Sequence, residues 1–264
     1  MLDSLWRNTE LPQEGETPCW EIYHENSKTG HYDASLSNEQ VAEIMTNLYD
    51  TFPYRNFQSI QLPETFSPVK RTFLEAVLDR STPANITPVK LTLEDLRTLL
   101  HCSYGVTRND QQEHLNRAFR TIPSGGALYP LELYFYTSRV DELESGLYHY
   151  NPTQNAIQLL RPGNFEASLS EIFVSFQSNL AYDTSLIVFI TAVFNRSTFK
   201  YKEKGYRFAL FEAGHLAQNL NLAATALDFG VINIGGYHDR LADRFLGLDG
   251  LNHSTIYING ICKR

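Results

Sequence analysis

Cysteine, methionine and tryptophan are scarce in this chain, and it contains no long hydrophobic run. Its 264 residues include three cysteines, two methionines and two tryptophans. Because Cys19, Cys102 and Cys262 are odd in number and far apart in the sequence, they define neither a disulfide framework nor a zinc site. The most apolar run, residues 186–194, has the length of a strand and is far shorter than the ~20 residues of a membrane span. We therefore expect neither a metal site nor a membrane segment.

Basic residues are too few and too dispersed for a nucleic-acid-binding surface. The chain has 22 Lys and Arg residues against 30 Asp and Glu residues, so its formal net charge is −8. No cluster of Lys and Arg reaches the density that a nucleic-acid footprint requires. Charged side chains also interrupt the first twenty residues, which excludes the apolar core of a signal peptide. These features predict a cytoplasmic protein that binds neither nucleic acid nor membranes.

Helix and strand patterns follow one another along the chain without a regular βαβ order. Capping boxes at Ser37–Gln40 and Thr92–Asp95 predict two helix starts, and we expect Gly105 to end the second helix as a left-handed cap. The longest helical pattern covers residues 206–229, and the polar residues 107–119 are expected to form a loop. Strand patterns cover residues 131–137, 146–150, 156–160, 186–194, 231–234 and 255–259. This mixture predicts an α+β fold with a mostly antiparallel central sheet flanked by helices.

The most informative segment is residues 123–130 (Pro-Ser-Gly-Gly-Ala-Leu-Tyr-Pro), which lead directly into a strand pattern. Gly125 and Gly126 have no Cβ, so the backbone can adopt positive φ and a flat ligand can lie against it. A proline at each end fixes φ there, and the Ser124 hydroxyl can donate or accept a hydrogen bond. The segment therefore suits a planar cofactor with polar edges. A tight connection between a helix and a strand is the alternative.

Three motifs occur in a fixed order along the chain. The first is Arg80-Ser81, followed by the leucine-rich helix pattern that ends at Tyr104-Gly105, and the second is residues 123–130. The third comprises Lys200-Tyr201, Gly205-Tyr-Arg207, Glu212-Ala-Gly-His215, Gln218-Asn219 and Gly235-Gly236. Together they resemble the nitroreductase superfamily, and most closely its azoline-oxidising branch. Those dehydrogenases convert thiazolines and oxazolines to azoles in modified peptides of the streptolysin S type.

The resemblance implies a nitroreductase-like fold and a homodimer that holds FMN at the subunit interface. It implies an N-terminal irregular or helical extension over residues 1–66, because Tyr23–Asn26 and Tyr54–Pro63 are similar to the N-terminal region of that branch. Residues 67–264 would then form the FMN-binding domain. The partners it implies are a peptide or small-molecule substrate and other proteins of a biosynthetic complex.

The resemblance also assigns roles to individual residues. Arg80 and Ser81 would hold the FMN phosphate, since a cationic fork suits a phosphate group. Gly235 and Gly236 would let the backbone approach the flavin ring from the second side. The remaining cofactor-binding residues would be Pro123, Ser124, Gly125, Gly126 and Leu128 along the isoalloxazine, and Gln218 and Asn219 facing the cofactor from the long helix.

The phosphate motif departs from the family pattern. It usually reads Arg-Arg-Ser-x-Arg, whereas residues 79–83 of this chain read Asp-Arg-Ser-Thr-Pro. A carboxylate beside a phosphate is unfavourable by Coulomb's law, so we expect weaker phosphate binding unless other cations compensate. Arg120 and the pair Lys263-Arg264 are the two candidates for that compensation.

Lys200 and Tyr201 are the catalytic pair that the resemblance implies. Azoline oxidation needs a base for the proton, and burial and proximity can bring the pKa values of a lysine and a tyrosine toward neutrality. The alternative is that Lys200 lies in a solvated surface run over residues 196–204. Three functions stay open at this stage: azoline dehydrogenase, nicotinamide-dependent nitro- or quinone-type flavin reductase, and non-catalytic flavoprotein partner subunit.

Overall fold

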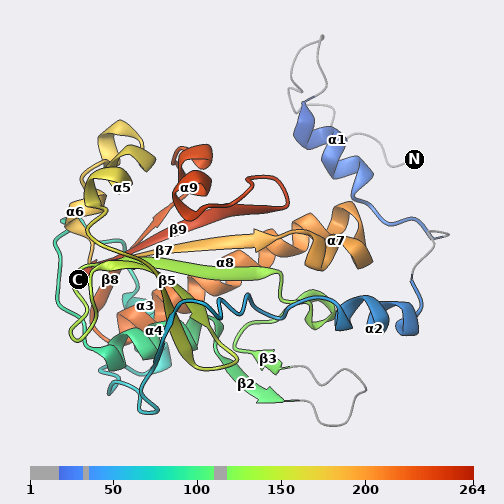
Figure 1. Cartoon of the computed structure of the whole chain (residues 1–264). Helices are drawn as coiled ribbons and strands as arrows, with labels where there is room; N and C mark the ends of the chain where they lie inside the picture. Colours follow the sequence, from blue (N-terminus) through green and yellow to red (C-terminus); the bar gives the residue numbers. More distant parts are fainter. Residues whose placement is uncertain (1–17, 32–35, 110–117) are drawn as a thin grey trace. The chain divides into compact units, whose positions relative to one another are not determined.

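The computed structural model describes residues 18–31, 36–109 and 118–264 of the chain. The chain divides into two compact units, Met1–Ala34 and Ser35–Arg264. The first contains helix α1 (Cys19–Asn26), which begins after Pro18 and has no buried residue. The second contains the remaining described elements and is the subject of the following paragraphs (Figure 1).

A sheet of seven strands forms the centre of the larger unit. Its strand order is β1-β6-β5-β4-β7-β9-β8, and each neighbouring pair is antiparallel. The strands are β1 (Gln58–Gln61), β4 (Leu131–Thr137), β5 (Gly146–Asn151), β6 (Ala156–Pro162), β7 (Leu186–Val193), β8 (Phe229–Ile234) and β9 (His253–Lys263). The predicted antiparallel α+β architecture is therefore confirmed. β1, which belongs to the expected N-terminal extension, pairs along β6 at the sheet edge.

Helices cover both faces of this sheet (Figure 1). Apolar residues of α4 and α8 form a core with one face, and those of α5, α6 and α9 form a second core with the other. The helices are α2 (Asn38–Thr46), α3 (Phe73–Asp79), α4 (Leu93–Tyr104), α5 (Glu166–Ile172), α6 (Leu180–Asp183), α7 (Asn195–Tyr201), α8 (Glu203–Ala226) and α9 (Asp239–Leu246). No helix within the described residues is long and apolar enough to cross a membrane.

The two-sided covering explains why strands β4, β5 and β7 are buried at every position. In β4, Leu133 and Phe135 point into the α4/α8 core, while Tyr134 and Tyr136 point into the core of α5, α6 and α9. Successive side chains of a strand point to opposite faces, so a strand that is covered twice buries both sets. All eight residues of β7 are buried for the same reason.

Both predicted capping boxes are present, whereas the predicted left-handed cap is not. Ser37 and Gln40 bond reciprocally at the start of α2, and Thr92 and Asp95 do so at the start of α4. Gly105 instead has φ −69° and ψ 157°, so the chain leaves α4 in an extended conformation. A Cβ at Gly105 would lie 2.2 Å from a ring nitrogen of His101, which explains the glycine sterically.

The region after Gly105 is more ordered than the predicted loop over residues 107–119. β2 (Val106–Asn109) and β3 (Ala118–Arg120) pair as a separate two-stranded sheet. The intervening residues 110–117 lie outside the described part of the chain. The loop prediction is therefore wrong for the two ends of this segment, where strand pairing satisfies the backbone groups of these polar residues.

Candidate active site

Residues 123–130, here called the Ser-Gly-Gly loop, hold a backbone conformation that is rare for residues other than glycine. Gly126 has φ +64°, and the non-glycine residues Ala127 and Tyr129 have φ +52° and +44°. Such residues cost of order 1–3 kcal/mol each and persist only where the surroundings fix them. One support is internal, because the Tyr129 N–H donates to the Ser124 Oγ over 2.9 Å.

The Lys200-Tyr201 pair lies over the exposed glycine of this loop. A Cβ at Gly126 would be 2.6 Å from the Tyr201 hydroxyl oxygen and 3.1 Å from the Lys200 Nζ. The Lys200 Nζ is 5.3 Å from the centroid of the Tyr201 ring. The Tyr201 ring packs edge-on against Phe208 at a centroid distance of 4.9 Å, and Phe208 also approaches Gly125. The structure thus brings together the glycines of the second motif and the Lys-Tyr pair of the third.

The helix that carries this pair is anchored by a buried ion pair. The Arg196 Nη1 of α7 is 2.6 Å from the Glu132 Oε1 of β4, and both side chains are almost fully buried. His149 bonds to the other carboxylate oxygen over 2.7 Å. Burial opposes ionisation of Glu132, but Arg196 and His149 outweigh it and hold its pKa well below the usual range. The alternative reading of residues 196–204 as a solvated surface is therefore wrong at Arg196.

A second buried carboxyl lies beneath the loop. Glu212 of α8 is 2% exposed and accepts a hydrogen bond from the Tyr104 hydroxyl over 3.2 Å. Burial raises the pKa of Glu212 to about 7. No role was predicted for Glu212 from the sequence. The sequence did contain a signal that Glu212 is buried. It lies four residues before Leu216 and so falls on the same, otherwise apolar, face of α8.

The other loop residues divide into exposed and inward-facing groups. Pro123 and Gly126 are exposed, and Ser124 and Gly125 are half-buried. Leu128 is buried against α2, where it forms a small apolar cluster with Val41 and Met45. Its side chain therefore faces α2.

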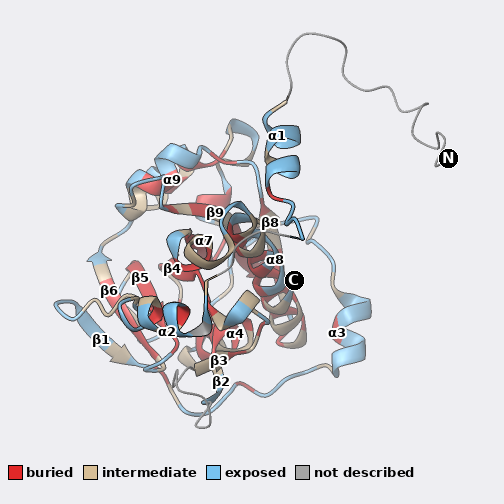
Figure 2. Cartoon of the chain, turned by 90° about the vertical axis from the view of Figure 1, so that its right-hand side faces the viewer, coloured by how far each residue is buried: buried red, intermediate tan, exposed pale blue. Residues whose placement is uncertain are grey.

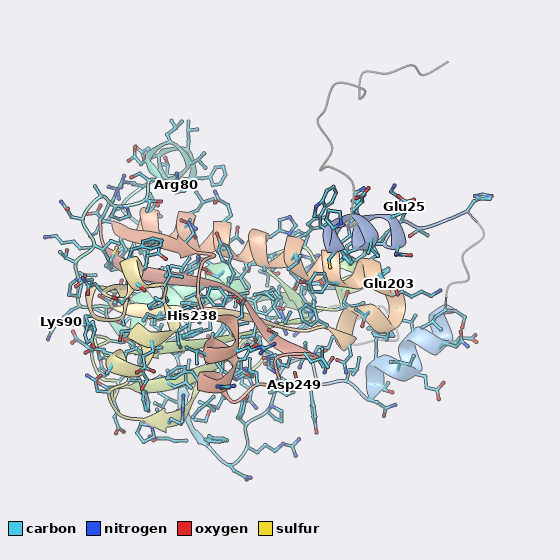
Figure 3. All side chains as sticks on the ribbon, turned by 90° about the horizontal axis from the view of Figure 1, so that it is seen from above. Glu25, Arg80, Lys90, Glu203, His238 and Asp249 are labelled. Atoms are coloured by element: carbon cyan, nitrogen blue, oxygen red, sulfur yellow. The ribbon has the colours of Figure 1, made fainter. Side chains whose placement is uncertain are left out.

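Arg80 and Ser81 do not lie near the Ser-Gly-Gly loop. They follow α3, which packs at the far end of α8, because Arg71 just before α3 donates to the Thr225 carbonyl over 2.8 Å. The loop contacts Phe208 near the start of α8, and residues 208 and 225 are about 25 Å apart along the helix axis. Figure 3 shows Arg80 well separated from Glu203, the first residue of α8.

Two arginines lie beside Asp79 in the altered phosphate motif. The Asp79 carboxylate is 3.1 Å from the Arg71 Nε and 3.8 Å from the Arg264 Nη2, which also donates to the Asp79 carbonyl. Asp79 is thus paired with two cations. Of the two candidates for compensation, Arg264 lies beside the motif, whereas Arg120 is buried with its guanidinium over the Tyr104 ring.

The remaining predicted residues lie along α8 and at the end of β8. Gln218 is exposed, and the Asn219 side-chain amide donates to the Cys102 carbonyl of α4 over 3.2 Å. Gly235 and Gly236 are exposed, and a Cβ on either would meet no atom within 4 Å. Gly235 lines a cavity of about 360 Å³ together with Tyr206 and Leu210 of α8, so this turn faces the first half of α8.

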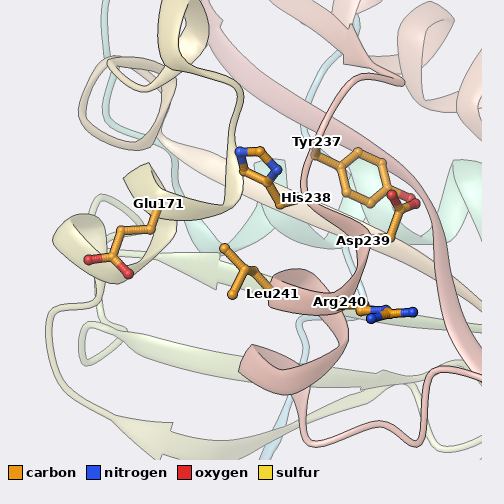
Figure 4. A pocket seen from close by; sticks show the side chains of 6 residues that line it. All are labelled: Glu171, Tyr237, His238, Asp239, Arg240 and Leu241. Carbon is orange, nitrogen blue, oxygen red and sulfur yellow. The ribbon is translucent and has the colours of Figure 1, made fainter.

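A larger cavity of about 570 Å³ opens next to the glycine turn (Figure 4). It is lined by Glu171, Tyr237, His238, Asp239, Arg240 and Leu241. The charged side chains of this set point in different directions and do not converge on one point (Figure 4). Within the described residues, no group of three or more His, Cys, Asp and Glu side chains is placed to hold a metal ion.

Comparison with known proteins assigns the chain to a family. Residues 80–260 match the Nitroreductase family. The chain belongs to the nitroreductase family. Members of this family are flavoproteins, and membership supports an oxidoreductase activity for this chain.

Individual relatives agree with this assignment. The nitroreductase-like protein MJ1384 of Methanocaldococcus jannaschii is 32% identical over 186 residues, which cover 68% of this chain and 85% of that protein. The microcin B17-processing protein McbC of Escherichia coli is 29% identical over 134 residues, 49% of each chain. Among solved structures, the E. coli microcin synthetase McbBCD complex with truncated pro-MccB17 bound has a chain with a TM-score of 0.58 at 20% identity. That match covers 89% of this chain and 99% of that one.

A second solved structure covers more of this chain. It comes from Anabaena variabilis and belongs to a nitroreductase-like protein, with a TM-score of 0.70 at 24% identity. The match covers 97% of this chain but only 49% of that one. The predicted nitroreductase-like fold is confirmed. The similarity to McbC supports a relationship with the microcin-processing type, while the narrower streptolysin S branch stays a prediction.

Proposed function

We propose that this chain is an FMN-dependent oxidoreductase that dehydrogenates azoline rings to azoles in a modified peptide. The observation that carries the proposal is the position of Lys200 and Tyr201 over Gly126. Their polar ends meet at the exposed side of a loop whose backbone suits a flat ring. The similarity to McbC, a protein that processes microcin B17, supports a peptide substrate.

The pair would provide the base that azoline oxidation requires. This reaction removes a proton from one ring carbon and a hydride from its neighbour. Bound FMN would supply the hydride acceptor, so the protein must supply the group that takes the proton. Lys200 and Tyr201 in their basic forms can do so, and a positioned base typically contributes 10²- to 10⁴-fold to the rate.

FMN would bind between two copies of the chain. In this proposal, residues 123–126 lie along the isoalloxazine with their backbone groups at its polar edge, and Gln218, Asn219 and the turn at Gly235-Gly236 approach it from the long helix and β8. Arg80 and Ser81 hold the phosphate. Because the loop and Arg80 lie at opposite ends of α8, farther apart than an FMN molecule can reach, the ring and the phosphate would contact different chains.

Helix α3 supports this dimer. Phe73, Leu74 and Leu78 are 76%, 64% and 75% exposed, so this short helix presents an apolar surface next to Arg80 (Figure 2). Contiguous exposed apolar surface commonly marks a protein–protein interface.

A nicotinamide-dependent nitro- or quinone-type reductase is the second candidate. The identity with MJ1384, which is higher than that with McbC and extends over more of the chain, favours it. Reduction of such substrates needs hydride delivery through the flavin, with protons available from solvent. The two candidates therefore differ in whether they need Lys200 and Tyr201.

One pair of variants and two assays separate these candidates. FMN is added to the purified protein, and oxidation of an azoline peptide is measured beside nitroarene reduction by a nicotinamide donor. For an azoline dehydrogenase, Lys200→Ala and Tyr201→Phe should retain FMN and lose azoline turnover by ~100-fold or more, with nitroarene reduction barely changed. Equal loss of both activities would contradict a base role for the pair. Absence of both activities in the wild type would favour a non-catalytic flavoprotein subunit of a biosynthetic complex.

A further inference from the structure

Lys202 joins α7 to α8 in a backbone conformation that is typical of glycine. Its φ is +50° and its ψ is −136°. These are the angles of the first central residue of a type II′ turn, the mirror image of type II, where a Cβ is unfavourable. Such strain persists only where the surrounding structure fixes it. Contacts of the neighbouring residues must therefore hold Lys202 in this turn.

Backbone hydrogen bonds place the turn directly between the two helices. The Lys202 N–H donates to the Thr198 carbonyl over 2.7 Å at the end of α7, and the Lys202 carbonyl accepts the Gly205 N–H over 2.9 Å at the start of α8. Each bond continues one helix into the turn. Neither bond joins α7 to α8, so the angle between the helices must be fixed by another contact.

Gly205 provides this contact, because its missing side chain lets the backbones of the two helices meet. A Cβ at Gly205 would lie 2.7 Å from both the Ser197 carbonyl carbon and the Thr198 nitrogen. Gly205 and Ser197 are buried, and the atoms that the Cβ would meet belong to the backbone. No side-chain rotation can therefore make room for it, and the two helices pack at a glycine three residues after the strained turn.

The same corner carries the candidate catalytic pair. Lys200 and Tyr201 are the last two residues of α7 and immediately precede the strained residue. The Tyr201 ring packs edge-on against Phe208, three residues after Gly205, at a centroid distance of 4.9 Å. Phe208 in turn approaches the Ser-Gly-Gly loop, since a Cβ at Gly125 would lie 2.9 Å from its ring. The separation of α7 from α8 at Gly205 therefore affects where Tyr201 lies relative to the loop.

We propose that Gly205 is a positioning residue for Lys200 and Tyr201. Its contact with the α7 backbone holds Lys202 in the strained turn, and this turn directs the last two residues of α7 toward Gly126. The functional consequence rests on the proposed function, in which the pair takes the proton from the azoline ring. The structural claim concerns the chain alone and can be tested without FMN.

Melting temperatures test whether Gly205 holds the strain at Lys202. Lys202→Gly places glycine in a conformation that it adopts freely, so it should raise the melting temperature of FMN-free protein by about 2 °C or more. Lys202→Ala, which also removes the charge but keeps a Cβ, should not raise it. In a Gly205→Ala background the turn has already relaxed, so Lys202→Gly should no longer stabilise the protein. No gain in the single variant Lys202→Gly, or an equal gain in both backgrounds, would overturn the proposal.

NMR spectroscopy measures the position of Tyr201 directly. Nuclear Overhauser effects between the Tyr201 and Phe208 rings report their contact in selectively labelled, FMN-free protein. They should weaken in Gly205→Ala, because the new methyl group pushes α8 away from α7. Gly214→Ala makes the same substitution on α8 at a glycine with nothing within 4 Å of its Cβ position, and should leave these effects unchanged. Equal effects in the two variants would contradict a positioning role for Gly205.

Turnover tests the functional consequence. Gly205→Ala should retain FMN and nitroarene reduction, and should lose azoline turnover by ~10-fold or more with little change in KM, as a displaced base implies. A glycine with a structural role alone would lower both activities together, and that result would overturn the positioning role.

Two outcomes are distinguished by the tests without FMN. If Gly205→Ala does not fold, a melting temperature that fails to rise in Lys202→Gly still overturns the proposal. Absence of azoline oxidation in the wild type would count against the proposed function, and the melting temperatures and ring contacts would still decide whether Gly205 positions the pair.

Discussion

The Tyr201 hydroxyl oxygen lies 2.6 Å from the position that a Cβ at Gly126 would occupy. The absence of a side chain at residue 126 therefore makes room for the Lys-Tyr pair. This gives the glycine a reason that the sequence analysis did not supply, since it had related Gly126 only to the approach of a flat ligand. The Ser-Gly-Gly loop and the Lys200-Tyr201 pair are therefore in direct contact, and a substitution in one should change the position of the other.

Gly126→Ala should separate steric placement from backbone strain. The new methyl group would push the Tyr201 hydroxyl aside, and alanine at φ +64° costs ~1–2 kcal/mol. We expect azoline turnover to fall by ~10-fold or more, as a displaced base implies. Gly247→Ala is the matched control, because Gly247 also has positive φ (+74°) but nothing within 4 Å of its Cβ position. Equal activity in the two variants would show that the contact with Tyr201 is unimportant.

A mixed dimer tests whether two chains share each flavin site. Arg80→Ala retains the loop, and Gly125→Val, whose Cβ would lie 2.9 Å from the Phe208 ring, retains Arg80. Each variant alone should bind little FMN. The mixed dimer should regain one FMN, because one of its two sites combines an intact loop with an intact Arg80. Spectroscopic FMN content and light scattering measure this, and no recovery in a confirmed mixed dimer would mean that the site does not span two chains.

Removal of the charge of Asp79 should strengthen binding of anions. Two carboxylates, Asp79 and Asp228, face Arg71 and Arg264, and Asp79→Asn removes one of them, so more of the positive charge is left to attract a phosphate. The gain should be a few-fold in the FMN dissociation constant, because exposed ion pairs involve about 1 kcal/mol or less. Asp141→Asn, which removes the carboxylate from an exposed pair with Lys90, is the control. An unchanged dissociation constant would place the phosphate elsewhere.

Glu212 should make the protein less stable as pH rises. Its pKa is about 7 in the folded chain against a usual 4.5, so between these values the unfolded chain ionises while the folded chain does not. The free energy of unfolding therefore falls as pH rises through this window, and above it the loss stays constant at about 3 kcal/mol. Glu212→Gln lacks this loss, so its stability relative to the wild type should improve between pH 4.5 and pH 8. Urea unfolding measures the free energy of unfolding of both proteins at each pH. A difference between them that does not change with pH would contradict the prediction.

Breaking the ion pair of Arg196 and Glu132 should lower the free energy of unfolding, measured by urea titration. Arg196→Met leaves the Glu132 carboxylate buried without its strongest partner, which typically costs 3–5 kcal/mol. The C-terminal end of α7 should loosen, and azoline turnover should fall with it. Lys90→Ala, which breaks an exposed pair with Asp141, should change the free energy of unfolding by less than ~1 kcal/mol in the same urea titration.

The fold was largely predictable because local patterns and tertiary structure agree. The capping boxes at Ser37 and Thr92 need only residues within one turn, so the sequence contains all the information they require. The left-handed cap predicted at Gly105 was wrong because the chain leaves α4 in an extended conformation and enters β2 at the next residue. The pairing of β2 with β3 was missed since no apolar alternation marks these short strands.

The sequence motifs of the candidate site could be recognised, but their arrangement in space could not be predicted from the sequence. The sequence indicated the Ser-Gly-Gly loop and the Lys200-Tyr201 pair separately, and the contact between them depends on how α7 packs on β4. The separation of Arg80 from the loop follows from the length of α8 and could not be read from motif order. Glu212 belongs to the third motif but received no role, because a carboxyl in an apolar stripe gains meaning only from its neighbours in the fold, such as Tyr104.

The position of β9 has a consequence for the way the chain folds during synthesis. This strand is made after every other strand of the sheet, yet it lies between β7 and β8 and bonds to both. Until residues 253–263 leave the ribosome, β7 and β8 each present an unpaired edge, and such edges recruit other chains. Chains that lack β9 should therefore be vulnerable to aggregation, and a chain truncated after residue 252 should aggregate more readily than the full chain.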